Sequence, residues 1–127
     1  MGQNKKNTLL VVEDSVDLQD LTKELFESEG YKVYCANNGQ EALDFLRKTQ
    51  AKVDLILLDL MMPVMDGYRF RREQLLDEHI AAIPVVVITA DGNAVMKVNQ
   101  LRASGFLNKA SGVDNMLDVV SRNVNKA

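Results

Sequence analysis

One aspartate stands at the end of an apolar run, and this placement limits what the chain can fold into. Asp59 follows four consecutive apolar residues, Leu55 to Leu58. A charged side chain cannot join a hydrophobic core without a large desolvation cost, so the chain must meet solvent or a metal ion at this point. The sequence therefore predicts a buried strand over residues 53–58 with a carboxylate at its carboxyl end.

Three other predicted strands end in polar groups of complementary chemistry. Glu13 and Asp14 follow the first apolar run, Thr89 follows the fourth, and Lys109 follows the fifth. Because the carboxyl ends of parallel strands meet at one edge of a sheet, these side chains should converge with Asp59. We expect carboxylates, a hydroxyl and an ammonium group in one place.

Strand-like and helix-like segments alternate along the whole chain. Strands are predicted near residues 8–13, 31–36, 53–58, 84–89 and 105–108. Helices are predicted between and after them, from the apolar spacing over 18–26, 42–46 and 113–124 and from weaker patterns around 68–77 and 93–104. This βα repeat is typical of an α/β domain.

The apolar content of each strand predicts its place in the sheet. The strands at residues 9, 55 and 85 are apolar throughout, as expected for central parallel strands covered on both faces. The strand over 31–36 alternates and that over 105–108 is short, so these should be the edges. Right-handed crossovers then give a doubly wound, flavodoxin-like five-stranded sheet in the order 2-1-3-4-5, a three-layer sandwich.

Length and composition fit one domain over residues 1–127, with residues 1–7 expected as a flexible N-terminal extension. The chain is 46% hydrophobic, which is enough for a core. Its net charge of -3 argues against direct binding of nucleic acid, which normally needs a basic face. No stretch approaches the roughly 20 apolar residues of a membrane span, so we expect no membrane insertion and a cytoplasmic location. Cys35 is the one cysteine, which excludes an internal disulfide, and it is expected to be a small buried side chain.

The predicted cluster of acids favours a hard metal ion. Close carboxylate pairs would repel by roughly 4 kcal/mol each at an intermediate dielectric, and a divalent cation removes that conflict. Mg²⁺ prefers carboxylates, waters and phosphate oxygens, whereas zinc is a poor candidate in a chain with a single histidine, His79. Lys109 and Thr89 could bind phosphoryl oxygens while Asp59 acts as a nucleophile.

Four motifs at the strand ends resemble the receiver domain of bacterial response regulators, and the resemblance covers essentially the whole chain. The motifs are the acidic pair in Val11-Val12-Glu13-Asp14, the phosphoacceptor loop from Asp59 to Gly67, the switch threonine in Ile88-Thr89-Ala90, and the aromatic residue and lysine in Phe106-Leu107-Asn108-Lys109. They occur in the order and at the strand ends that the family requires.

The resemblance implies a role for each site residue. A histidine kinase or a histidine phosphotransfer protein would donate a phosphoryl group to Asp59. Mg²⁺ would be held by Asp14, Asp59 and the backbone carbonyl of Met61, with Glu13 acting through water. Thr89 would then move toward the phosphoryl group and Phe106 would turn inward.

The resemblance also implies an output. The surface formed by the fourth helix, fifth strand and fifth helix would change and control a downstream protein target. The chain would be a stand-alone regulator, not an enzyme beyond its own phosphorylation and slow dephosphorylation.

Two positions depart from the family pattern. Receiver domains usually have a proline with a cis bond after the lysine, whereas this chain has Ala110, for which a cis bond would cost roughly 2.5 to 4 kcal/mol. Met61 is apolar where some relatives carry a polar group that helps to orient water. Slow dephosphorylation is the hypothesis that follows from Met61.

Other functions remain alternatives at this stage. The chain could be a degenerate receiver that only binds proteins. A Mg²⁺-dependent phosphatase of the haloacid-dehalogenase type also uses a strand-end aspartate, but it needs a second acid where this chain has Met61. A flavodoxin-like flavin carrier is disfavoured because the acidic loop over 13–17 would repel a flavin phosphate.

Several residues also have purely structural interpretations. Asp14 could cap the first helix, Ser111 is a plausible N-cap of the last one, and Phe106 could be a core residue. The cluster of Arg69, Arg71 and Arg72 is expected to form a solvated face. His79 is expected at the surface.

Overall fold

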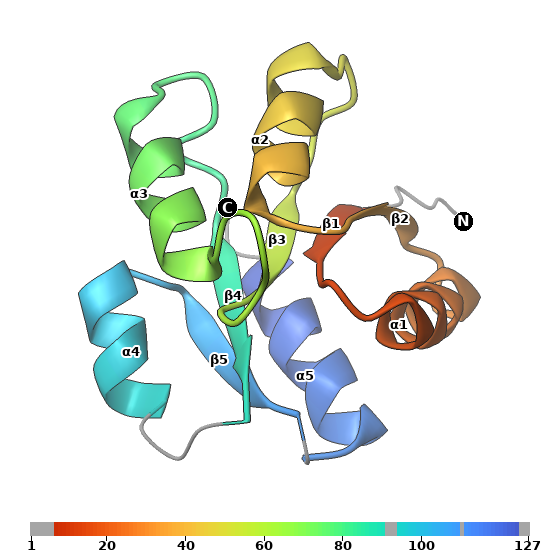
Figure 1. Cartoon of the computed structure of the whole chain (residues 1–127). Coiled ribbons are helices and arrows are strands. Elements are labelled where there is room, and N and C mark those ends of the chain that lie inside the picture. The colour runs from red at the N-terminus through yellow and green to blue at the C-terminus, as the bar shows by residue number, and fades with distance from the viewer. Residues whose placement is uncertain (1–6, 91–93, 110, 125–127) are drawn as a thin grey trace.

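The computed structural model describes residues 7–90, 94–109 and 111–124, in which strands and helices alternate (Figure 1). The strands are β1 (Thr8–Val12), β2 (Lys32–Ala36), β3 (Leu55–Asp59), β4 (Val85–Thr89) and β5 (Gly105–Asn108). The helices are α1 (Val16–Ser28), α2 (Gly39–Lys48), α3 (Gly67–Leu76), α4 (Ala94–Leu101) and α5 (Val113–Val124). Residues 1–6 of the expected extension and Ala110 lie outside the described residues.

The five strands form one parallel sheet in the order β2-β1-β3-β4-β5, which confirms the predicted topology. β1 pairs with β2 on one side and with β3 on the other, and Leu9 lies opposite Leu55. β4 and β5 continue the sheet from β3. The apolar strands are therefore central, and the alternating and short strands are at the edges.

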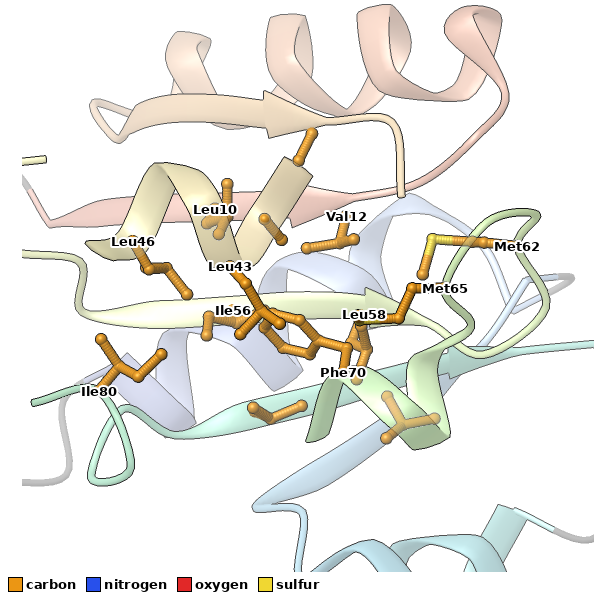
Figure 2. Close-up of a cluster of buried hydrophobic side chains, with 14 of the residues drawn as sticks. Leu10, Val12, Leu43, Leu46, Ile56, Leu58, Met62, Met65, Phe70 and Ile80 are labelled. Atoms are coloured by element: carbon orange, nitrogen blue, oxygen red, sulfur yellow. The ribbon is translucent and has the colours of Figure 1, made fainter. Parts of the chain in front are cut away.

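Successive residues of each central strand point into different halves of the core. Leu10, Ile56 and Leu58 pack with α2, α3 and the end of α4 in the cluster that Figure 2 shows. Leu9 and Val11, on the opposite face of β1, pack with side chains of α1 and α5. Helices thus cover both faces of the sheet (Figure 1), because each central strand is apolar on both sides.

The first helix has a different N-cap from the one considered in the sequence, and two of its leucines lie outside its buried face. Ser15 is its N-cap and accepts a hydrogen bond from the N–H of Leu18, so the interpretation of Asp14 as the cap is wrong. The buried polar and aromatic face of α1 consists of Gln19, Thr22 and Phe26. Leu18 and Leu21, which helped to predict the helix, are exposed.

The N-cap prediction for Ser111 is also wrong. Helix α5 begins at Val113, and Gly112 is the residue that precedes it. The hydroxyl of Ser111 donates to the carbonyl oxygen of Asn108 and accepts from the side chain of Asn115. It therefore stabilises the turn between β5 and α5 without capping a backbone N–H.

The arginine cluster does not form one solvated face. Arg69 and Arg72 are exposed, but Arg71 is buried, and its guanidinium donates to the carbonyl oxygens of Leu101 and Arg102 at 2.9 Å each. The prediction is wrong for Arg71 because the carbonyls at the end of α4 provide acceptors that a periodicity argument cannot foresee.

Cys35 is exposed, so its prediction as a buried side chain is wrong. It lies on the edge strand β2. Partial burial raises the pKa of its thiol, and the charges of Lys23, Asp20 and Glu27 on α1 also affect that pKa. His79 is exposed as predicted. Among the described residues, no helix combines the length and apolarity that crossing a membrane would require.

Candidate functional site

The carboxyl ends of the central strands bring three acids together. Glu13 follows β1, Asp14 follows Glu13, and Asp59 is the last residue of β3. One carboxylate oxygen from each lies within 4.8 Å of the others. Glu13 and Asp59 are buried and Asp14 is exposed, so the cluster opens to solvent on the Asp14 side. The predicted convergence of these three residues is confirmed.

Lys109 supplies the positive charge at this cluster. Its Nζ lies 3.3 Å from Oδ2 of Asp59 and 3.4 Å from Oε1 of Glu13. The lysine follows β5, and its backbone N–H donates to the carbonyl oxygen of Thr89 at 3.0 Å. That bond extends the pairing of β4 and β5 by one residue and fixes the backbone position from which the lysine side chain extends.

The ionisation of Glu13 is opposed by its surroundings. Burial raises the pKa of the Glu13 carboxyl, and the negative charge of Asp59 raises it further. The N–H of Ser15, which donates to Glu13 at 3.1 Å, and the ammonium group of Lys109 act in the opposite direction without cancelling the shift. Additional positive charge is therefore favourable here.

The ammonium form of Lys109 is stabilised in spite of its partial burial. Burial alone lowers the pKa of Lys109, but attraction to Asp59 and Glu13 is stronger, so the pKa is raised overall. The side chain keeps 32% of its surface exposed, so an incoming anion can reach it. The site thus pairs a charged lysine with two buried carboxylates.

The loop after β3 is fixed close to Asp59. The N–H of Met61 donates to Oδ1 of Asp59 at 3.2 Å, and the N–H of Gly67 donates to the carbonyl oxygen of Leu60 at 3.0 Å. A Cβ at Gly67 would lie 2.6 Å from the carbonyl oxygen of Asp59, so only glycine fits there. The side chain of Met61 is 76% exposed and makes no part of the buried site.

The remaining predicted residues lie on the neighbouring strands. Thr89 ends β4 and is buried, next to β5 and Lys109. Phe106 is 40% exposed, so its interpretation as a core residue is wrong. The next residue, Leu107, is buried instead, because β5 is an edge strand whose alternate side chains face solvent.

The donor chemistry of the cluster fits a hard divalent cation. All three side-chain ligands are carboxylates, and their net charge exceeds that of the one lysine paired with them. Mg²⁺ takes one or two protein carboxylates and fills its other positions with water and phosphate oxygens, which suits a cluster that is open on one side.

Comparison with known proteins identifies the family. The family model described as "Response regulator receiver domain" matches residues 9–121. The chain is 33% identical over 117 residues to sporulation initiation phosphotransferase F of Bacillus subtilis, covering 90% of each chain. The sheet order, the acidic cluster at its switch point and these matches agree, and the chain belongs to the response regulator receiver domain family.

Other relatives are longer than this chain. It is 38% identical over 105 residues to the transcriptional regulatory protein CpxR of Escherichia coli, which covers 81% of this chain and 43% of CpxR. The chain thus spans less than half the length of that relative. The function of this chain is the one that receiver domains share, which is signalling as a switch.

The response regulator protein TrrA of Thermotoga maritima, solved in complex with Mg²⁺ and BeF, has a similar structure. The two chains superpose with a TM-score of 0.79 at 26% identity, over 91% of this chain and 97% of TrrA. The similarity supports the fold and the family.

Two residues that shape this site were not predicted from the sequence. Gly67 was part of the predicted phosphoacceptor loop, but its close approach to the Asp59 backbone was not foreseen. Gln19 is buried beside the acidic loop, where its side chain donates to the carbonyl oxygen of Glu13. No apolar periodicity points to a glutamine, and the exposed leucines of α1 hid which face is buried.

Proposed function

We propose that this domain is a phosphoacceptor switch in which Asp59 receives a phosphoryl group from a phosphohistidine. The observation that carries the proposal is the arrangement of Asp59 between a half-exposed lysine and two further carboxylates. Asp59 is held by its contacts with Lys109 and the N–H of Met61, which leaves its carboxylate positioned as a nucleophile. The donor is a histidine kinase or a histidine phosphotransfer protein.

The transfer exchanges one bond for another. A carboxylate oxygen of Asp59 forms a bond to phosphorus while the bond from phosphorus to the histidine nitrogen breaks. The electron pair of that bond remains on the nitrogen of the donor imidazole. Lys109 shifts its ammonium group from the carboxylates to the transferred phosphoryl oxygens, and the Thr89 hydroxyl donates to another of them.

Asp14, Asp59 and the backbone carbonyl of Met61 would hold Mg²⁺, and Glu13 would act through water. When bound, Mg²⁺ offsets the negative charges of the carboxylates and of the phosphoryl oxygens. TrrA, a relative of similar fold, was solved with Mg²⁺ and BeF, which supports this assignment. The three carboxylates also support it, because they outnumber the one lysine paired with them.

Phosphorylation changes the surface at the β5 edge of the sheet. Thr89 moves toward the phosphoryl group, and Phe106, now 40% exposed on the neighbouring strand, turns inward. The surface of α4, β5 and α5 then changes and recruits or releases a downstream protein. Shifting such a switch from 1:99 to 99:1 takes about 5.5 kcal/mol, which several charge-assisted hydrogen bonds can supply.

Intact-mass measurement tests the proposal. The protein is incubated with acetyl phosphate and Mg²⁺, and wild type is compared with Asp59→Asn. We expect one phosphate adduct on wild type and none on the variant. An adduct on both proteins contradicts the assignment of Asp59, and an adduct on neither indicates a degenerate receiver that acts only by binding.

A further inference from the structure

Gln19 joins two loops at the edge of the acidic cluster. It lies on the buried face of α1 and is 8% exposed. Its side-chain amide donates to the carbonyl oxygen of Glu13 and, at 2.7 Å, to Oδ1 of Asn37. Both hydrogens of one NH₂ group are thus used to connect the loop after β1 with the loop after β2.

The connection continues into the second helix. The Nδ2 of Asn37 donates to Oε1 of Glu41 at 2.9 Å, and the backbone N–H of Asn37 donates to the same oxygen at 3.0 Å. Asn38 is the N-cap of α2 and accepts from the N–H of Glu41. The residue to which Gln19 donates is therefore fixed at the start of a helix.

The same helix start contacts the loop that follows Asp59. The N–H of Gly39 donates to the carbonyl oxygen of Met65 at 3.0 Å, and a Cβ at Gly39 would lie 2.9 Å from that oxygen. A series of hydrogen bonds thus links three loops: that of Glu13, that of Asn37 and that of Met65. The first of these loops carries Glu13 and Asp14, and the third directly follows Asp59.

We propose that Gln19 is a positioning residue that sets the affinity of the acidic cluster for a divalent cation, an inference that rests on the proposed function. The carboxylates repel one another, so the loop of Glu13 and Asp14 is favoured to move away from Asp59 when no cation is bound. Gln19 holds that loop at its backbone and anchors it through Asn37. Being neutral, it does so without competing with the cation for the carboxylates.

The restraint acts on affinity more than on the chemical step. Hydrogen bonds that orient metal ligands typically contribute about 10- to 100-fold to metal affinity. Gln19 contacts a backbone carbonyl and none of the proposed ligand oxygens, so we expect the lower end of that range. Replacing it should weaken Mg²⁺ binding about tenfold and leave the phosphorylation rate at saturating Mg²⁺ within about twofold of wild type.

Calorimetric titration with MgCl₂ tests the inference on wild type, Gln19→Met and Thr22→Val. Gln19→Met keeps the side-chain length and removes both donors. Thr22→Val is the matched control, because Thr22 is a buried polar residue of the same helix, 7% exposed and three positions further along it. We expect a higher dissociation constant for Gln19→Met and an unchanged one for Thr22→Val.

A second variant keeps the test decisive if Gln19→Met does not fold. Asn37 is exposed, and Asn37→Ala removes the anchor of Gln19 without opening the core. This change should also weaken Mg²⁺ binding. The double variant should bind no more weakly than Gln19→Met alone, because the two residues act through one hydrogen bond.

Each outcome separates the inference from the proposed function. Wild type that takes up no Mg²⁺ at millimolar concentrations contradicts the proposed function itself. Wild-type binding together with an unchanged dissociation constant in Gln19→Met and in Asn37→Ala contradicts only the role of Gln19. Equal weakening in Thr22→Val also contradicts it, because the effect would then come from the packing of α1.

Discussion

Lys109, which is partly buried, and Arg71, which is fully buried, contact opposite kinds of acceptor. Lys109 keeps 32% of its side chain exposed and contacts the carboxylates of Glu13 and Asp59. Arg71 is 6% exposed and donates to the carbonyl oxygens of Leu101 and Arg102 and to the side chain of Gln74, with no carboxylate among its recorded partners. One cation faces acids at an open edge, and the other faces neutral acceptors inside the protein.

The difference indicates what each charge is for. The acids beside Lys109 hold it loosely at an exposed position, from which it can move to an incoming anion. Arg71 has exchanged water for carbonyls at the end of α4, and burial, with repulsion from Arg102, lowers its pKa. Its guanidinium stays charged in proteins and stabilises the negative end of the helix dipole. Lys109 is thus suited to chemistry and Arg71 to holding α3 against α4.

The largest expected effect is on stability, at Arg71. Arg71→Leu leaves the buried acceptors of Leu101, Arg102 and Gln74 without their donor, which should lower the free energy of unfolding by about 2 to 4 kcal/mol. Urea denaturation measures the loss. Arg72→Leu, an exposed neighbour on the same helix, should change stability by at most about 0.5 kcal/mol. Equal losses in both variants would contradict the difference between the two arginines.

At Lys109 the expected effects are on phosphorylation and on Mg²⁺ binding. Lys109→Gln should slow phosphorylation by acetyl phosphate about 100-fold, because a donor to the developing phosphoryl charge is lost. The same change should strengthen Mg²⁺ binding several-fold, since the competing ammonium group is gone. Calorimetry and stopped-time intact-mass assays measure the two effects. Weaker Mg²⁺ binding in this variant would show that Lys109 organises the acids rather than opposing the cation.

The pH dependence of stability sharpens the view of Glu13. Its folded-state pKa is raised above the usual 4.5, so its ionised form destabilises the fold. That penalty is absent below pH 4.5 and develops as pH rises through the folded pKa. Glu13→Gln should therefore raise the free energy of unfolding at pH 7, by less than the Arg71 change lowers it, and the gain should shrink toward pH 4.5. Urea titrations without Mg²⁺ at both pH values check this, and a gain that grows at low pH would contradict it.

The smallest expected effect concerns the lifetime of the phosphoryl group. The side chain of Met61 is 76% exposed beside Asp59 and offers no hydrogen bond to an attacking water. Met61→Asn adds a polar group there and should speed dephosphorylation several-fold, a barrier change of about 1 kcal/mol. Decay of the adduct mass after removal of acetyl phosphate measures it. Met61→Leu is the matched control and should decay like wild type.

The sequence was sufficient for the fold and for the charged groups of the site. Apolar runs that end abruptly in Glu13 and Asp59 defined the strand ends, and the parallel topology brought those ends together. This worked because a charged side chain is too costly in a purely apolar core, whereas at the strand ends the buried Glu13 and Asp59 are paired with Lys109.

Contacts between distant segments could not be predicted in this way. Arg69, Arg71 and Arg72 are the same residue type on one helix. Only the carbonyl acceptor at the end of α4, about thirty positions later, makes Arg71 the buried one. The leucine spacing of α1 predicted a helix but not that Gln19 faces inward, because Leu18 and Leu21 are exposed. The burial of Phe106 could not be predicted either, because it lies on an edge strand with one face toward solvent.

Locating the phosphoryl group on the chain tests the assignment of the acceptor most directly. Borohydride reduces an aspartyl phosphate to homoserine, so the protein is treated with acetyl phosphate and Mg²⁺, reduced, digested and sequenced by mass spectrometry. We expect homoserine at position 59 and at no other acidic residue. Homoserine at position 14, or a modified glutamate at position 13 with Asp59 intact, would contradict it.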